Sequence, residues 1–519
     1  MKKITALLIL IIPVFIYAQY NISYFSNDIS EAIKFKRIFS ITIGSNASNI
    51  LDYDFSELID LKKICIDSLY PYDENSFNDS EQIIKILENL HGDTINFRSI
   101  INEPHTIIPA IIRIISKYSD MSNKFFNISE NSRMFGSLYN LKTLTITCFE
   151  SNPKDIIKYC SNIVTLDSLT FYIADLTHLP EEIGELSNLK SFSYIYNDST
   201  LNFKHGINIL KKLPHLNSLS FEVNRFDSVP NEIGELTNLE YLELVSCEIE
   251  YISPKISKLT KLKSLNLLYN FIDVYPPEFW QLTSLEELRI DFLLRYIENY
   301  YNITKFKCLK VLELSLYKTN RIDIRRKWIR FFNQLKKLKE LKELHINGYY
   351  RDNPFSFQIF LNKGNDIFMN QISKLKNLEI LSIDFPIIDF PDNFHKLKKL
   401  KVLSIELEKE FPDELLKMTS LEELNLVLYE IDTIPIGIAN LVNLKILRLW
   451  YDPIFSFPSQ IVNLPQLEIL DLSNNEIDSL PESIENLTSL KTLILINNPI
   501  SEEEQKRIQQ LLPNTEIVW

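Results

Sequence analysis

The stretch Leu464–Asn498 reads LPQLEILDLSNNEIDSLPESIENLTSLKTLILINN, and it contains one pattern twice. Leucine occupies positions 464, 467, 470 and 472, and it returns at positions 487, 490, 493 and 495. An asparagine follows each series, at positions 475 and 498, so the period is 23 residues. Neither a helix nor a strand alone has such a period, whereas stacked repeat proteins have periods of about 20–50 residues. The stretch therefore predicts an array of small stacked units.

The pattern LxxLxxLxLxxNxIxxLPxxIxx resembles the leucine-rich-repeat family in its 23-residue form. This resemblance implies an α/β solenoid of horseshoe shape, with a concave parallel β-sheet and with short helices, 3-10 turns or loops on the convex side. The residues support the same expectation. The alternation within LxxLxL favours a short strand whose leucines face inward. The proline of LPxxI lacks an N–H and fixes φ, so it suits a turn or the start of a short helix.

The template can be laid along most of the chain. Repeats are predicted to begin at Leu138, Ile163, Leu186, Leu213, Leu236, Leu259, Leu282, Phe306, Leu338, Leu375, Leu397, Met418, Leu441, Leu464 and Leu487. The asparagine position holds Asn197, Asn224, Asn270, Asn475 and Asn498, and in one repeat Cys247. A side-chain amide there can bond to the backbone where the chain leaves the strand. We therefore expect about fifteen repeats over 138–498, irregular and long at 306–374, with structural asparagines and a buried Cys247.

The N-terminal segment MKKITALLILIIPVFIYAQY has the pattern of a secretory signal peptide. Lys2 and Lys3 precede an apolar run from Ile4 to Tyr17, and Ala18 suits cleavage before Gln19. The run is short for a membrane span; the alternative is an uncleaved anchor. We expect residues 1–18 to be removed, the protein to be exported (periplasmic, cell-surface or secreted), and no membrane span to remain. Residues 19–137 are predicted to be degenerate repeats or a capping region, since LIDLKKICI fits the template.

The five cysteines are Cys65, Cys148, Cys160, Cys247 and Cys308, and their spacing matches no metal motif. An odd number leaves at least one unpaired thiol in an exported chain. A disulfide between Cys148 and Cys160 and a set of buried free thiols both remain open.

Two long repeats and a terminal helix depart from the template. Residues 321–342 combine a basic run with apolar residues at helical spacing, which predicts an amphipathic helix on the convex side. The aromatic-rich segment YYRDNPFSFQIFLNKGNDIF is either a protruding loop or packs on its neighbour. At the end, Ser501 and Glu504 form a capping-box pattern, so a helix over about 502–512 is predicted to seal the array within a cap at 499–519.

Composition and motif searches argue against several functions. With 9 glycines, phosphate-binding loops are nearly excluded, and a net charge of −13 argues against a nucleic-acid partner. No catalytic or metal-binding motif is present, so no cofactor and no enzymatic activity are expected. The acid pairs Glu286/Glu287 and Glu422/Glu423 recur at equivalent repeat positions and are interpreted as a solvated strand face. No further domain is expected after Trp519.

The predicted concave face offers a binding surface instead. Its central exposed row comprises Thr170, Ser193, Ser220, Glu243, Asn266, Arg289, Glu313, His345, Ser382, Ser404, Asn425, Arg448 and Asp471. Arginine and aromatic residues commonly anchor protein interfaces. Two groups at or beside this row are therefore the candidate protein-binding residues, namely Arg448, Trp450 and Tyr451, and Tyr269, Arg289 and Phe292. The alternative is that these side chains pack laterally against neighbouring strands.

The leading hypothesis is a non-enzymatic exported protein-interaction module that binds a protein or peptide on its concave face. The N-terminal signal and the EEEQ…LLPN cap resemble exported repeat proteins of Bacteroidetes-type bacteria. A surface adhesion protein that binds glycans is an alternative, because tyrosine and tryptophan can stack on sugars. An enzyme whose site lies in 19–137 is a further alternative, although no motif there supports it.

Overall fold

The computed structural model describes residues 40–43, 63–67, 94–98, 143–148, 166–173, 176–196, 200–317, 324–348, 365–387, 390–408, 410–429, 431, 434–450, 454 and 456–519. The chain divides into an N-terminal unit, Met1–Leu262, and a C-terminal unit, Lys263–Trp519. Each unit is built on the predicted plan, in which a short strand is followed by a return segment and then by the next strand.

In the N-terminal unit a parallel sheet runs in chain order through β1 (Ser40–Ile43), β2 (Lys63–Asp67), β3 (Thr94–Arg98), β4 (Thr143–Cys148), β5 (Ser168–Ile173), β6 (Ser191–Ile195), β7 (Ser218–Glu222) and β9 (Tyr241–Val245). The short strands β8 (Ser228–Val229) and β10 (Tyr251–Ile252) pair separately. Strand β2 lies within the LIDLKKICI segment, where the sequence resembles the template. The extent of 19–137 as a capping region stays a prediction, because most of it lies outside the described residues.

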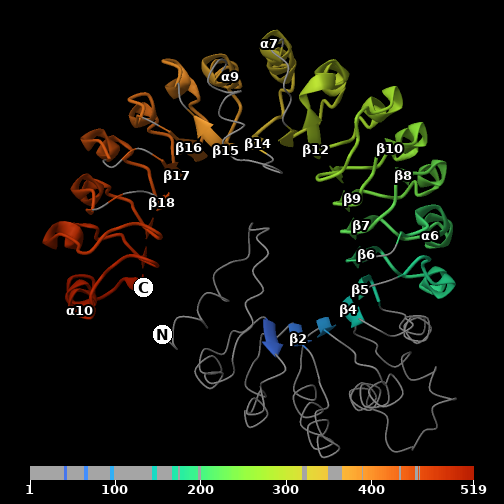
Figure 1. Ribbon diagram of the computed structural model, residues 1–519, viewed down its shortest axis with the longest axis horizontal. Coiled ribbons are helices and arrows are strands. Elements are labelled where there is room, and N and C mark those ends of the chain that lie inside the picture. Colours follow the sequence, from blue (N-terminus) through green and yellow to red (C-terminus); the bar gives the residue numbers. More distant parts are fainter. Residues whose placement is uncertain are drawn as a thin grey trace, which may run out of the picture. The chain divides into compact units, whose positions relative to one another are not determined.

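In the C-terminal unit the parallel sheet runs through β11 (Ser264–Asn266), β12 (Glu287–Leu293), β13 (Val311–Tyr317), β14 (Glu343–Gly348), β15 (Ile380–Ile387), β16 (Val402–Leu407), β17 (Glu423–Leu428), β18 (Ile446–Trp450), β19 (Ile469–Asp471), β20 (Thr492–Ile494) and β21 (Glu516–Val518). Within this unit the strands lie on the inner side of a curve and the helices on its outer side (Figure 1). The concave parallel sheet expected from the sequence is confirmed.

The return segments contain short helices. In the N-terminal unit they are the 3-10 helices η4 (Glu181–Glu185), η5 (Asn231–Glu235) and η6 (Pro254–Lys258) and the α-helix α6 (Phe203–Leu210). In the C-terminal unit they are η7 (Pro277–Gln281), η8 (Leu294–Lys305), α7 (Ile324–Leu335), α9 (Asn365–Ile372), η9 (Phe394–Lys396), η10 (Leu415–Lys417), η11 (Ile436–Asn440), η12 (Ser459–Asn463), η13 (Glu482–Asn486) and α10 (Glu502–Leu511).

Proline determines where several of these helices begin. Pro180, Pro230, Pro435 and Pro481 each stand immediately before a 3-10 helix, with φ between −62° and −79°. Each proline occupies the N-cap position in an extended conformation that its fixed φ allows, and the N–H that it lacks would have had no partner within the helix. The predicted role of the LPxxI proline is therefore confirmed at these four positions.

The core lies between the sheet and the return segments. The inward leucines of successive strands, such as Leu288, Leu312 and Leu344, have no exposed surface. Burying one such side chain contributes about 1.5–3 kcal/mol. The predicted helix α7 adds Phe331 and Phe332, which are also fully buried and pack near each other with their ring centroids 5.6 Å apart. The helix is thus held by its apolar face, as its periodicity indicated.

In several repeats an asparagine side chain bonds to the backbone where the chain leaves its strand; we call these the ladder asparagines. Asn475 donates from Nδ2 to the carbonyls of Leu449 and Leu472, both at 2.9 Å, and is 4% exposed. Asn224, Asn270 and Asn498 make equivalent bonds to backbone carbonyls. These bonds supply donors to backbone carbonyls where the strand ends, so the structural role predicted for these asparagines is confirmed.

Cys247 replaces the ladder amide in one repeat and is fully buried. Its Sγ lies 3.3 Å from the carbonyl oxygens of Phe221 and Val245, so the thiol is a weak donor to the same kind of acceptors. Burial raises the pKa of this thiol, which therefore stays protonated. The buried position predicted for Cys247 is confirmed, whereas the proposed disulfide between Cys148 and Cys160 lies outside the residues whose side chains are described.

The end of the chain differs from the expected capping box. Helix α10 begins after Ser501, whose side chain accepts from Glu504 N at 3.2 Å, and Ile508 is fully buried, as predicted. The Glu504 carboxylate, however, accepts from Leu480 N at 3.0 Å and pairs with Arg507. The cap is thereby tied to the preceding repeat. The helix is followed by β21, a strand that the sequence pattern did not indicate.

Several predictions fall outside the described residues. These are the signal peptide at 1–18, Asn197, Tyr451 and the aromatic-rich segment at 349–364. At the end of that segment Phe368 lies in α9 and is buried against Phe332 and Phe385. None of the helices in the described part of the chain has both the length and the apolar character that a membrane crossing requires.

Candidate functional concave surface

The strand register brings the predicted exposed residues of the C-terminal unit into one row. Asn266, Arg289, Glu313, His345, Ser382, Ser404, Asn425, Arg448 and Asp471 are paired strand by strand in this order. We call them the central row. In the N-terminal unit, described by itself, Thr170, Ser193, Ser220 and Glu243 pair in the same way. The register that the sequence predicted for these positions is confirmed.

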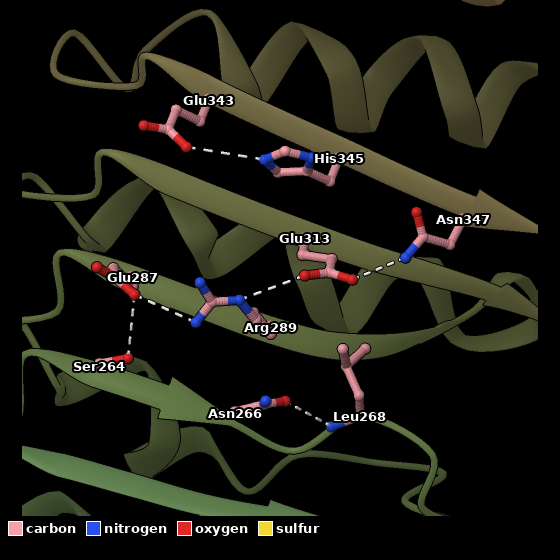
Figure 2. A network of polar contacts seen from close by, with 9 residues as sticks. All are labelled: Ser264, Asn266, Leu268, Glu287, Arg289, Glu313, Glu343, His345 and Asn347. Carbon is pink, nitrogen blue, oxygen red and sulfur yellow. Dashed lines mark hydrogen bonds and ion pairs between the residues drawn. The ribbon is translucent and has the colours of Figure 1, made fainter. Parts of the chain in front are cut away.

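Arg289 on β12 is held between two carboxylates of the same sheet (Figure 2). Its Nη1 lies 3.1 Å from Glu287 Oε2, and its Nε lies 3.3 Å from Glu313 Oε2. Glu313 also accepts from Asn347 Nδ2 at 2.7 Å, and Ser264 Oγ donates to Glu287 at 3.3 Å. The Arg289 side chain keeps 21% of its surface exposed. The guanidinium is therefore fixed in place and still reachable from the concave side.

Arg448 on β18 has a similar environment, six strands along the sheet from Arg289 on β12. Its Nη1 donates to Glu423 Oε1 at 2.5 Å and to Asn425 Oδ1 at 2.9 Å, and its side chain is 24% exposed. Asn425 Nδ2 in turn donates to Ser404 Oγ at 2.8 Å. The lateral packing considered from the sequence is thus real, and it leaves each arginine partly exposed.

Trp450 ends β18 and is half-buried. Its Nε1 donates to Asp471 Oδ2 at 2.8 Å, while Asp471 Oδ1 accepts from Ser473 N at 3.0 Å. The indole is therefore oriented by a carboxylate on the next strand. The structure brings Arg448 and Trp450 onto one strand, as expected, while Tyr451 lies outside the part of the chain that is described.

Tyr269 lies in the turn after β11 and is 39% exposed. Its φ is 63°, a left-handed conformation that costs a non-glycine residue free energy. The turn is held by the buried carboxylate of Asp291, which accepts from Tyr269 N at 3.0 Å and from Asn270 N at 2.6 Å. The sequence pattern did not single out Asp291, although its place two residues after Arg289 in an alternating strand puts it on the concave side.

The proposal that Phe292 anchors a partner is wrong. Phe292 has no exposed surface and packs with ring centroids 4.3 Å from Tyr300 and 4.6 Å from Phe331. Strand β12 continues to Leu293, so the alternation carries Phe292 inward after Leu288 and Ile290. The aromatic ring belongs to the core beneath η8 and α7.

A group of carboxylates on the same face was also missed. The register between β15 and β16 shifts between Ile383 and Pro386, and Asp384 lies in this irregularity, where it accepts from Gly348 N. Desolvation of its carboxyl group, reinforced by the charges of Glu406 and Glu313, raises the pKa of Asp384 to about 8, against the hydrogen bond from Gly348 N. Burial also raises the pKa of Glu406, against the hydrogen bond from the Tyr429 hydroxyl at 2.9 Å. The sequence pattern of a single repeat gives no signal for such a bulge, because the bulge arises in the pairing of two strands.

The two residues of each recurring acid pair, Glu286/Glu287 and Glu422/Glu423, make different contacts. Glu286 pairs with Lys310 at 2.5 Å, and Glu422 pairs with Lys401 and Lys445, so these two carboxylates stabilise the stacking of neighbouring repeats. The hydrogen bond from Lys310 lowers the pKa of Glu286. Glu287 and Glu423 turn to the concave side and hold Arg289 and Arg448. Among the described residues no group of histidine, cysteine and carboxylate side chains has metal-ligand geometry.

Comparisons with known proteins agree with this architecture. A model described as a leucine-rich repeat region matches residues 196–359, and a second, described as leucine rich repeat, matches residues 442–500. A solved leucine-rich-repeat protein of Leptospira interrogans is 26% identical, with a TM-score of 0.50, and the match covers 78% of this chain and 98% of that one. The chain is a leucine-rich-repeat protein.

Two further solved structures match with lower TM-scores. An internalin of Listeria monocytogenes is 16% identical, with a TM-score of 0.35, over 80% of this chain and 95% of that one. The plant peptide hormone receptor RGFR1, solved in complex with RGF2, is 18% identical, with a TM-score of 0.37, over 89% and 66%. No protein with a curated function matches this leucine-rich-repeat protein.

Proposed function

We propose that this leucine-rich-repeat protein is an exported, non-catalytic interaction module that binds a protein or peptide on the concave face of its C-terminal unit. The observation that carries the proposal is the central row, in which Arg289 and Arg448 are fixed by ion pairs and remain partly exposed. Repeat solenoids commonly use an extended concave surface for binding. Side chains that are already ordered lose little conformational entropy when a partner binds.

The charge of this face favours a partner with basic side chains. Its partly exposed carboxylates include Glu287, Glu313, Glu343 and Glu423, and they outnumber the guanidinium groups of Arg289 and Arg448. A lysine or arginine of the partner would pair with these carboxylates, and complementary charge steers association.

Affinity capture with residues 19–519 as bait tests this function. We expect a basic protein or peptide to be retained, and we expect the double variant Arg448→Ala and Trp450→Ala to weaken its binding at least about tenfold, since interface anchors commonly contribute more than 1 kcal/mol each. The matched control is Ile436→Ala with Val442→Ala, which removes exposed apolar side chains from η11 and from the segment that follows it. Equal retention of every partner by both variants would place the binding surface elsewhere.

Export rests on the N-terminal pattern of Lys2, Lys3 and the apolar run to Tyr17. Expression of the full chain in a bacterial host, followed by intact-mass measurement of the protein outside the cytoplasm, is expected to show a chain that starts at Gln19. A chain that keeps Met1 and stays with the membrane would instead indicate an uncleaved anchor.

A further inference from the structure

One edge of the C-terminal unit carries lysines in four successive repeats. They stand where a helix ends and the chain turns back to the next strand. We call them the lysine edge: Lys305 and Lys307 before β13, Lys336, Lys337 and Lys339 before β14, Lys374 and Lys376 before β15, and Lys396, Lys398 and Lys399 before β16. All are exposed except Lys336, which is half-buried. This edge is strongly basic in a chain whose net charge is −13.

Several of these ammonium groups donate hydrogen bonds to neutral oxygens. Lys337 Nζ lies 2.7 Å from Gln334 Oε1, Lys374 Nζ lies 3.1 Å from Gln371 Oε1, and Lys399 Nζ lies 3.0 Å from Asn377 Oδ1. Lys339 and Lys376 donate to backbone carbonyls at 3.3 Å and 2.6 Å. Within the described ranges, no lysine of this edge forms an ion pair.

Nearby lysines outside this set behave differently. Lys310, Lys342 and Lys401 stand next to the strands and pair with Glu286, Glu379 and Glu422. Lys310, Lys342 and Lys401 therefore join neighbouring repeats through ion pairs. The lysines of the lysine edge form no ion pair with the described carboxylates. Glu340 lies within the same segment as Lys339 and pairs with none of these lysines in the part of the chain that is described.

The lysines also repel one another across repeats. Burial and the charge of Lys374 lower the pKa of Lys336, and burial and the charge of Lys396 lower the pKa of Lys376. A lysine at the C-terminal end of a helix interacts favourably with the helix dipole and stabilises the helix by about 0.3–1 kcal/mol. That effect accounts for one lysine per repeat, but not for lysines on both sides of the repeat leucine, such as Lys337 and Lys339.

We propose that the lysine edge binds a linear acidic polysaccharide whose sulfate or carboxylate groups bridge successive repeats. The lysines recur once or more in each repeat, so they form a periodic row, which matches a polymer with regularly spaced anionic groups. Strands are roughly 4.8 Å apart in the sheet, which sets the shortest spacing between equivalent lysines. This binding is independent of a partner on the concave face.

Other polyanions fit this edge less well. Single-stranded nucleic acid commonly stacks its bases on aromatic side chains, and peripheral membrane attachment commonly adds apolar side chains that insert between lipids. The large exposed apolar residues in the described part of the C-terminal unit are Tyr269, Phe271, Val274, Tyr429, Ile436, Val442 and Ile496, and all lie outside 305–399. Binding through the described lysines is therefore expected to be electrostatic.

The test uses residues 19–519 with fluorescent heparin and polygalacturonate oligosaccharides as probes, read by anisotropy at several salt concentrations. The variant carries Lys339→Gln, Lys376→Gln and Lys398→Gln, which are equivalent positions in three adjacent repeats. The control carries Lys190→Gln, Lys211→Gln and Lys491→Gln, three lysines that form exposed ion pairs elsewhere and give the same change in net charge. Thermal unfolding of both is measured in parallel.

We expect at least one probe to bind, with an affinity that falls steeply as salt rises, as counterion release requires. The edge variant should weaken this binding about tenfold or more, and its unfolding temperature should stay equal or rise, because repulsion is relieved. The control and the double variant Arg448→Ala with Trp450→Ala should bind the probe like the unchanged protein. The proposal is overturned if neither probe binds, if the edge variant binds equally well, or if the protein binds only vesicles of anionic phospholipid.

Discussion

Replacing Phe292 by alanine is expected to lower the free energy of unfolding by about 3–5 kcal/mol, the usual cost of removing a buried phenylalanine. The ring has no exposed surface and contacts Tyr300 of η8 and Phe331 of α7. Its loss would leave a cavity where β12, η8 and α7 meet. Because repeat arrays are held by nearest-neighbour interfaces, the loss should destabilise the repeats on both sides. Denaturant unfolding followed by circular dichroism measures the effect.

Tyr269→Ala is the matched control, since the sequence placed both aromatics in one candidate site. Tyr269 is 39% exposed, and its φ of 63° is equally unfavourable for alanine. We expect a change of about 1 kcal/mol or less, as for most surface substitutions. If Phe292→Ala instead left stability unchanged and abolished partner binding, Phe292 would be a surface anchor after all.

Replacing Asn475 by alanine is expected to lower the free energy of unfolding by about 2–4 kcal/mol. The Asn475 amide satisfies the carbonyls of Leu449 and Leu472 in a site that water does not reach. Each buried acceptor left without a donor costs about 1–3 kcal/mol. The effect should appear in urea unfolding as a lower midpoint.

Asn443→Ala provides the control for the ladder. Asn443 Nδ2 also donates to a backbone carbonyl, that of Thr419 at 2.7 Å, but this residue is exposed. Water can replace its hydrogen bond, so a loss of about 0.5 kcal/mol or less is expected. Equal losses in the two variants would show that burial of the ladder is not what makes it stabilising.

The repeat period alone predicted the elements that depend on local pattern. Leucines at spacings of three, three and two residues indicate inward-facing strand positions, and the structure confirms them from Leu288 to Leu493. The same alternation placed Arg289 and Arg448 in one exposed row. The asparagine position and the LPxxI proline were predictable because each supplies a specific hydrogen-bonding or φ requirement.

Features that depend on strand length or on neighbouring repeats could not be predicted in this way. Phe292 was misplaced because β12 extends to Leu293, and one repeat of sequence does not fix where a strand stops. Asp384 lies in an irregularity of pairing between β15 and β16, which arises only when two strands are compared. The basic run at 321–342 was visible, but the neutral acceptors of Lys337 and Lys374 were not.

The claim that the concave face binds the partner is tested most directly by hydroxyl-radical footprinting of the full mature chain with and without the captured partner. Mass spectrometry would follow the oxidation of Trp450, which is half-buried on β18, and of Ile436, which is 78% exposed on η11. We predict that the partner slows the oxidation of Trp450 and leaves Ile436 unchanged. Protection of Ile436 with no change at Trp450 would contradict binding on the concave face.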